Sequence, residues 1–257
     1  MLFRLLLTAF LIWPLAGMTQ EDVRKSDVVR LLKKIQLEQN SRPALRAVGF
    51  EGAKLDLMLD HGRKLAGNTV ILNFVADRLI AARSGQLGGP VDEMLVPLLN
   101  RGMPYLPVKE QLYHLRVELT VMKALSPANC GRTVKETIAP QVLSQTLSRT
   151  IARLNAPALK EYLRVVRKAS TLGVSRPRPP AMSNATREAV LLRFSQNIAA
   201  GAAQAGLSKS AARADVDIRR LSNQEACKLG ILFVETILNT KGSDLRPLLE
   251  LFWRDFT

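Results

Sequence analysis

The sequence predicts an all-α protein. Its 257 residues are 47% hydrophobic but only 5% aromatic, and Leu, Ala and Arg, which favour helices, are abundant. Apolar residues recur at helical spacing along most of the chain, and no run alternates in polarity as a half-buried strand does. We therefore expect a multi-helix bundle of about ten helices, in two packed groups, behind a cleaved N-terminal signal.

The first residues have the layout of a secretory signal. Arg4 is the only charge among the first twenty residues, and residues 5–17 are apolar or small except for Thr8. This run is shorter than the roughly 20 apolar residues that span a bilayer. Met18 stands where a lipoprotein would carry its lipidated Cys. We expect residues 1–17 to be a signal peptide and the protein to be periplasmic or secreted; an uncleaved anchor and a buried N-terminal helix are the alternatives.

The first group of helices is expected in residues 18–172. A capping-box pattern at 19–22 begins a helix that should end near Arg42-Pro43, since proline disfavours helix at the residue before it. Gly49 and Gly52 interrupt the helical composition of 44–65. Further helices are expected from residue 69 to the breaker-rich segment 84–90, over 92–99, and over 107–125 with its buried side formed by Leu112, Leu115, Leu119 and Met122.

Two more helices complete that group. Thr133 and Glu136 resemble a second capping box, for a helix that runs to about residue 154 with a kink at Pro140. Asn155 caps the next helix, over 157–172, with Pro157 near its first turn.

A linker should separate this group from the C-terminal helices. Residues 173–184, GVSRPRPPAMSN, combine Pro, Gly and Ser without apolar periodicity. Beyond it, the C-terminal subdomain 185–257 is expected to hold helices over 185–205, 208–221 and 223–238, and a short last helix capped by Ser243-Asp244.

The chain has two cysteines, Cys130 and Cys227. An even pair in an exported chain predicts a disulfide, because oxidising compartments preserve it. Two cysteines and two histidines spread over the chain do not resemble a structural zinc site. We expect one disulfide and no metal or cofactor.

Charge is the strongest functional signal. The net charge is +15, which favours anionic partners. One stretch is almost free of acids, with Glu161 alone among its bases, and it supplies the candidate binding residues Arg149, Arg153, Lys160, Arg164, Arg167, Lys168, Arg176 and Arg178. Within the expected 157–172 helix the bases recur at one side and Leu159, Leu163 and Val166 at another.

These observations predict a basic envelope protein that binds rather than catalyses. Its partner would be an anionic envelope component, such as a phosphorylated lipid or polysaccharide, or an acidic protein, with peripheral membrane contact. A solvated basic face that only keeps the protein soluble is the alternative.

Two other functions remain open from the sequence. An envelope hydrolase could assemble its site in the fold from Asp60-His61, His114 or one of several helical glutamates, although the nucleophile-elbow, phosphate-loop and HExxH motifs are absent. Residues 204–221 also resemble the turn and second helix of a helix-turn-helix, with Gly206 at the turn, which would indicate nucleic-acid binding in the cytosol.

Overall fold

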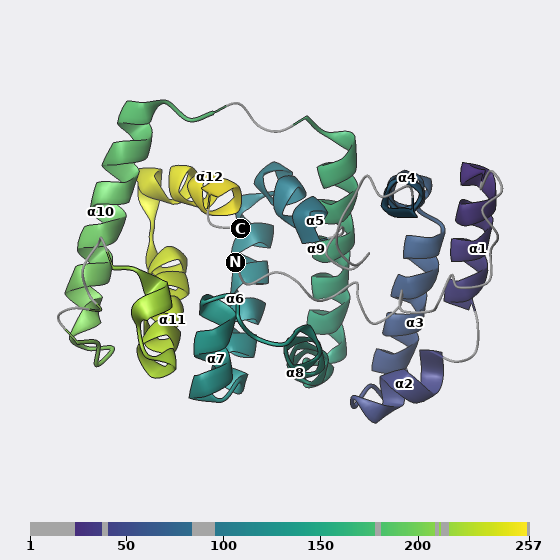
Figure 1. The fold of residues 1–257 in the computed structure, drawn as a ribbon, viewed down its shortest axis with the longest axis horizontal. Helices are drawn as coiled ribbons and strands as arrows, with labels where there is room; N and C mark the ends of the chain where they lie inside the picture. The colour runs from purple at the N-terminus through teal and green to yellow at the C-terminus, as the bar shows by residue number, and fades with distance from the viewer. Residues whose placement is uncertain are drawn as a thin grey trace. The chain divides into compact units, whose positions relative to one another are not determined.

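The chain is all-α, as predicted. A computed structural model describes residues 24–37, 41–83, 96–177, 181–208, 211 and 216–255. These residues form twelve α-helices and three short 3-10 helices, and no strand occurs among them (Figure 1). The expected signal peptide, residues 1–17, lies outside the described residues.

The described helices belong to two compact units, each made of segments that are distant in the sequence. The α9 unit comprises the described residues of 4–105 and 147–177, and the disulfide unit those of 106–146 and 178–257. Residues 106–146 thus pack with the C-terminal helices, whereas the linker at 173–184 led us to expect one group on each side of it. The boundary in the chain falls within α8 (Pro140–Ala152).

The α9 unit is built around α9 (Ala156–Ser175). The other helices of this unit are α1 (Lys25–Leu37), α2 (Ser41–Ala47), α3 (Gly52–Ala66), α4 (Thr69–Arg83), α5 (Val96–Gly102) and the 3-10 helix η3 (Met103–Tyr105). Helices α3, α4 and α5 contact α9, and α1 contacts α3 and α4. The apolar core there includes Val28, Leu65, Leu72, Val75 and Leu98.

Two glycines allow α5 and α9 to meet backbone to backbone. A Cβ atom added at Gly102 would lie 1.7 Å from the carbonyl oxygen of Ala169, and one at Gly173 would lie 1.9 Å from that of Leu98. Figure 1 shows the two helices side by side. Because no other residue type fits either position, this contact fixes how closely α5 packs on α9.

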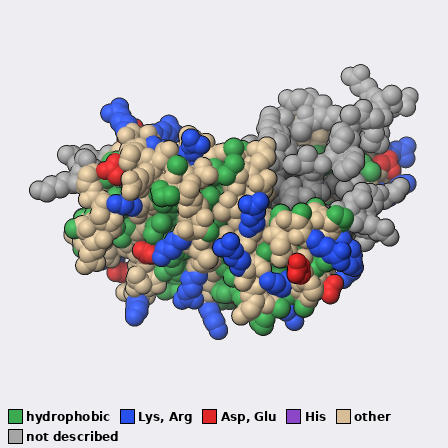
Figure 2. All heavy atoms as spheres, turned by 90° about the horizontal axis from the view of Figure 1, so that it is seen from below, with side chains coloured by type: hydrophobic (Ala, Val, Ile, Leu, Met, Phe, Trp, Pro, Cys, Tyr) green, Lys and Arg blue, Asp and Glu red, His purple; other side chains and the backbone are tan. Residues whose placement is uncertain are grey.

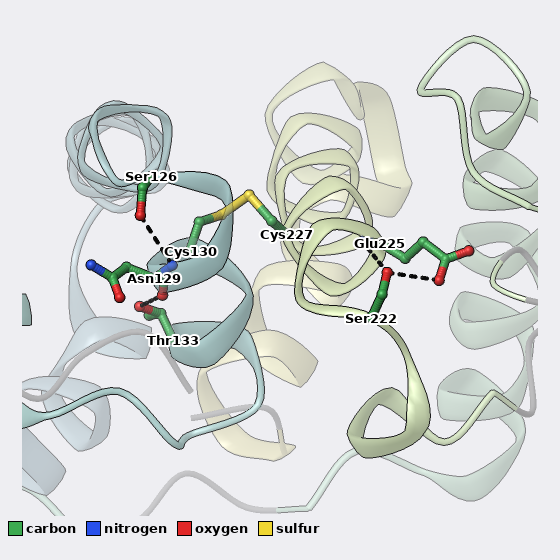
Figure 3. The surroundings of a disulfide bond; sticks show 7 residues. All are labelled: Ser126, Asn129, Cys130, Thr133, Ser222, Glu225 and Cys227. Atoms are coloured by element: carbon green, nitrogen blue, oxygen red, sulfur yellow. Dashed lines mark hydrogen bonds between the residues drawn. A yellow bond between two sulfur atoms is a disulfide. The ribbon is translucent and has the colours of Figure 1, made fainter.

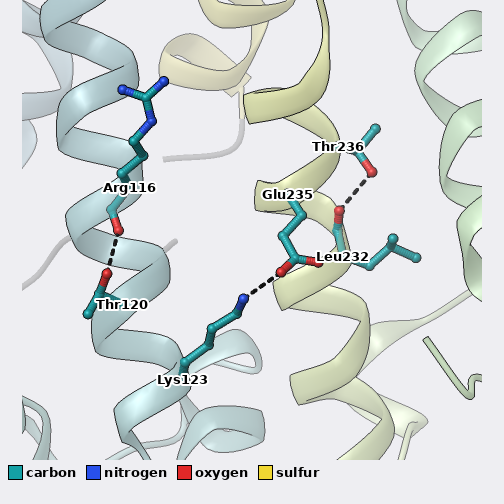
Figure 4. A network of polar contacts seen from close by, with 6 residues as sticks. All are labelled: Arg116, Thr120, Lys123, Leu232, Glu235 and Thr236. Atoms are coloured by element: carbon teal, nitrogen blue, oxygen red, sulfur yellow. Dashed lines mark hydrogen bonds and ion pairs between the residues drawn. The ribbon is translucent and has the colours of Figure 1, made fainter. Parts of the chain in front are cut away.

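The disulfide unit packs α6 (Val108–Ala124), α7 (Pro127–Val134) and α11 (Asn223–Asn239) together, with α10 (Asn184–Ala202) and α12 (Leu245–Asp255) on α11. Lys123 Nζ of α6 lies 2.6 Å from Glu235 Oε1 of α11 (Figure 4). Phe194, Phe233, Phe252 and Trp253 form a chain of aromatic contacts through α10, α11 and α12. The 3-10 helices η4 (Ile218–Arg220) and η5 (Gly242–Asp244) precede α11 and α12.

Several predicted helix boundaries were wrong at prolines. Pro43 lies inside α2, in its first turn, where the missing amide hydrogen has no partner to lose. Pro140 begins α8 instead of kinking a longer helix. The predicted capping box at Thr133 and Glu136 does not form, because Thr133 is still inside α7 and Glu136 adopts a left-handed φ of 60°.

Two further predictions need correction. Helix α9 continues through Gly173 to Ser175, so the linker begins later than residue 173. The helix predicted over 208–221 is not found where the chain is described: residues 207–208 and 216–217 are irregular and 218–220 form the 3-10 helix η4. In the helix-turn-helix resemblance, the segment expected to be the second helix is therefore not α-helical at either of its described ends.

The glycine contact between α5 and α9 gives a direct test of the fold. Gly173→Ala should lower the free energy of unfolding by about 3 kcal/mol or more, since a methyl group would overlap the Leu98 backbone. Gly62→Ala in α3 is the matched control: no atom lies within 4 Å of the added Cβ, so it should stabilise by about 0.5–1 kcal/mol. Urea unfolding measures both, and equal effects would contradict this packing.

Candidate functional site

The candidate basic residues lie mainly on the solvent side of α9. Asn155 begins this helix, its side-chain oxygen accepting the Ala158 amide hydrogen bond at 2.9 Å. Leu159, Leu163 and Val166 are buried, which confirms the predicted apolar face. On the opposite side Lys160 and Lys168 are exposed, and Arg164 and Arg167 are half-buried. The helix therefore separates its apolar and basic residues as the sequence indicated.

Three of these cations form no ion pair with an acid in the part of the chain that the structure describes. Glu161, the only acid in the stretch, accepts two hydrogen bonds from Arg164, at 2.8 and 2.7 Å, and neutralises that guanidinium. By contrast, Arg149, Arg153 and Lys160 are exposed and form no ion pair with any described residue. Figure 2 shows Lys and Arg side chains spread over the face in view, with fewer Asp and Glu among them.

The remaining predicted basic residues lie before or after α9 in the chain. Arg149 is in the last turn of α8, and Arg153 follows its end, directly before α9 begins. Arg176 is exposed at the carboxyl end of α9, about 24 Å along the helix axis from Lys160. Arg178 lies outside the described residues. We define the basic face as Arg149, Arg153, Lys160, Arg164, Arg167 and Lys168.

The Asp60-His61 dipeptide of α3 lies close to Arg167 of this face but is not arranged as a catalytic pair. Asp60 is bound to Lys64 at 2.6 Å, and this hydrogen bond lowers its pKa. The His61 ring is buried, and burial, with the nearby Arg167 charge, lowers its pKa to about 4. His61 is therefore a neutral packing residue at neutral pH, and its Nδ1 has no hydrogen-bond partner among the described residues.

A second group of polar side chains is buried in the disulfide unit. Gln111, His114 and Glu118 lie on one side of α6, and all three are buried. The Gln111 Nε2 donates to the Leu106 carbonyl at 2.8 Å, and the Trp253 Nε1 donates to Gln111 Oε1 at 2.8 Å. The His114 Nε2 lies 3.4 Å from Glu118 Oε1. We call these three side chains, together with Trp253, the buried polar cluster.

Burial shifts the pKa of both titratable members of this cluster in the direction that favours the uncharged form. It lowers the pKa of His114 to about 3 and raises the pKa of Glu118 well above 4.5. The sequence pointed to Leu112 and Leu119 as members of the buried side of α6, but both are only half-buried. Glu118 was one of several helical glutamates that nothing in the sequence set apart. Its position one turn after a buried His114 was the available signal.

The disulfide joins α7 to α11, as the cysteines predicted. Cys130 and Cys227 are bonded, with their Cα atoms 5.1 Å apart (Figure 3). Around it, Ser126 begins α7 by accepting the Asn129 amide hydrogen bond. Ser222 caps α11, because its hydroxyl oxygen accepts the Glu225 amide hydrogen bond at 3.2 Å and its hydroxyl donates to Glu225 Oε2 at 2.9 Å. Hydrogen bonds from Ser208 and Ser222 lower the pKa of Glu225.

The same two helices approach too closely for any side chain at one point. A Cβ atom at Gly131 would lie 1.9 Å from the carbonyl oxygen of Asn223. The Lys135 ammonium also donates to the Leu221 carbonyl across this contact. The disulfide is therefore set within a close helix contact, and both half-cystines are buried.

No family model, curated protein or solved structure matches this chain. Among the described residues, no group of His, Cys, Asp or Glu is placed to hold a metal ion, and no helix is long and apolar enough to cross a membrane. The fold and its surface define a basic, disulfide-bonded all-α protein.

The buried polar cluster predicts a specific pH dependence. Glu118 has a raised pKa in the folded state, so its contribution to stability is present below pH 4.5 and is lost as pH rises through the folded value. Glu118→Gln should therefore stabilise the protein at pH 8. The gain should grow by up to about 1.4 kcal/mol for each pH unit above 4.5, until the pH reaches the pKa of Glu118 in the folded state.

Urea unfolding from pH 5 to 8 measures this gain, with the exposed Glu188→Gln of α10 as the matched control. If the difference in the free energy of unfolding between Glu118→Gln and the parent does not grow with pH, the burial of an ionisable Glu118 is contradicted.

Loss of the disulfide gives a separate test. The bond closes a loop with a sequence separation of 97, so the double substitution Cys130→Ser, Cys227→Ser should lower the free energy of unfolding by about 2–5 kcal/mol. Urea unfolding followed by circular dichroism measures the loss. The parent protein in reductant should match the variant, and an unchanged unfolding midpoint would contradict a stabilising bond.

Proposed function

We propose that this chain is an exported binding protein of the cell envelope, which holds an anionic envelope component on its basic face. The observation that carries the proposal is that Arg149, Arg153 and Lys160 are exposed and form no ion pair with an acid of the described residues. Guanidinium groups bind phosphate and carboxylate oxygens through paired hydrogen bonds, and an ammonium adds a mobile charge.

The arrangement of α9 supports this role. Because its apolar side is buried, the basic residues of the helix have no alternative orientation and are held at the surface by a rigid element. A partner would find the cations already placed and would lose little entropy in ordering the backbone that carries them. Glu161 leaves the face with a net positive charge after neutralising Arg164.

Export is supported by two independent features. The first seventeen residues have the composition of a secretory signal. The Cys130–Cys227 disulfide is of the kind that persists in oxidising compartments such as the periplasm. In that setting the accessible polyanions are lipid headgroups and polysaccharides, which is why we favour them over nucleic acid.

A charge-matched pair of variants tests the proposal. The triple variant Arg149→Gln, Arg153→Gln, Lys160→Gln should bind vesicles of phosphatidylglycerol and phosphatidylcholine about a hundredfold more weakly than the parent, since each base near an anionic surface contributes about 1 kcal/mol. Cosedimentation in physiological salt measures binding, and heparin serves as the polysaccharide probe.

The control removes the same charge elsewhere. Arg42, Arg46 and Arg116 are also exposed and free of ion pairs with described residues, and changing all three to Gln should leave binding within about threefold of the parent. An equal loss in both triple variants would show that only net charge matters. That result, or a parent that binds neither vesicles nor heparin, would overturn the proposal.

A further inference from the structure

The disulfide unit has a hollow between the start of α10 and the end of α12, separate from the basic face. It encloses about 550 Å³ including its open mouth. Its lining combines three apolar side chains with four polar ones: Ala181, Met182, Leu251, Asn184, Arg187, Glu250 and Arg254. None of the candidate residues drawn from the sequence lines it.

Contacts of α10 and α12 with neighbouring elements of the same unit fix the two walls. Arg193 of α10 pairs with Asp244, just before α12, at 2.9 Å. Phe194 of α10 meets Phe233 of α11 with ring centroids 4.7 Å apart, and Phe233 meets Phe252 of α12 at 6.0 Å. Leu251 is only 2% exposed and forms part of this core as well as of the hollow. The hollow is therefore bounded by packed helices.

Its charges are unequal and lie on both walls. Arg187 comes from α10, and Glu250 and Arg254 come from α12, one turn apart and thus on the same side of that helix. The lining thus carries two guanidinium groups and one carboxylate. Helix α10 has no acid in its first turn, so the positive end of its dipole is not offset there and adds to the same field.

We propose that this hollow binds a free apolar α-amino acid. The two guanidinium groups suit its carboxylate, the Glu250 carboxylate suits its ammonium group, and Met182 and Leu251 suit its side chain. A dianion such as phosphate would meet the charge of Glu250, and a simple amine would meet two guanidinium groups. A zwitterion is the class of small ligand that matches all three charged groups at once.

The test uses the full chain and calorimetric titration with five probes. L-leucine or D-leucine should bind, whereas 4-methylpentanoate lacks the ammonium group, 3-methylbutylamine lacks the carboxylate, and inorganic phosphate lacks both the ammonium group and the apolar side chain. Each of these three should bind at least about tenfold more weakly. Arg187→Gln and Arg254→Gln should each weaken leucine binding by at least about tenfold. Glu250→Gln should weaken leucine binding but leave that of 4-methylpentanoate unchanged or improved.

Arg116→Gln is the matched control, since Arg116 is an exposed arginine of the same unit that does not line the hollow. Because Arg187 is exposed, its variant should fold even if the half-buried Arg254 is needed for packing, and thermal melting of each variant checks this. The proposal is overturned if neither leucine enantiomer binds, if phosphate or the amine binds as tightly, or if folded Arg187→Gln binds leucine like the parent.

Discussion

The burial of one side of α9 is the constraint on which the basic face depends. Leu159, Tyr162, Val165 and Val166 are each at most 1% exposed, and burying a side chain of this size contributes about 1.5–3 kcal/mol. Rotating the helix to hide its cations would expose these residues and desolvate several charges at the same time. The position of Lys160 and its neighbours is thus a consequence of core packing.

Close helix contacts at glycine make that packing possible in both units. Gly173 brings α9 onto α5, and Gly131 brings α7 onto α11. Each contact replaces side-chain packing by backbone packing, which is geometrically stricter, because a backbone cannot change rotamer to make room. In the disulfide unit the covalent bond lies beside such a contact. The glycine contact and the disulfide act on different states. The glycine permits close packing in the folded state, and the disulfide restricts the conformations of the unfolded chain.

Periodicity predicted the helices that carry a continuous apolar side. Helices α6, α9, α10 and α11 begin and end within a few residues of the expected positions. Pro107 and Asn155 marked the first two starts in the sequence, whereas Ser183 and Ser222 are identified as the caps of α10 and α11 by the structure. The basic face was predicted for the same reason, since an amphipathic helix fixes which residues face solvent.

Where local chemistry allowed two outcomes, the sequence did not decide between them. A proline can begin a helix or bend one, and at Pro140 the left-handed Glu136 shortly before it had already ended α7. Glu118 sits at a helical position that could have been exposed, and tertiary packing decides its burial: α11 and α12, from a distant part of the chain, both contact α6. Tertiary contacts of this kind, and the hollow between α10 and α12, have no local sequence pattern.

The two proposed sites differ in the ratio of acidic to basic side chains, and this difference decides what each can bind. On the basic face the exposed cations outnumber the single acid, so the positive field extends into solvent. Such a field suits a large polyanion whose exact structure matters little. In the hollow one acid lies near two cations over an apolar floor, so the field varies over short distances and binding depends on where each charge of the ligand falls. Selectivity is therefore expected from the hollow, and affinity governed by ionic strength from the face.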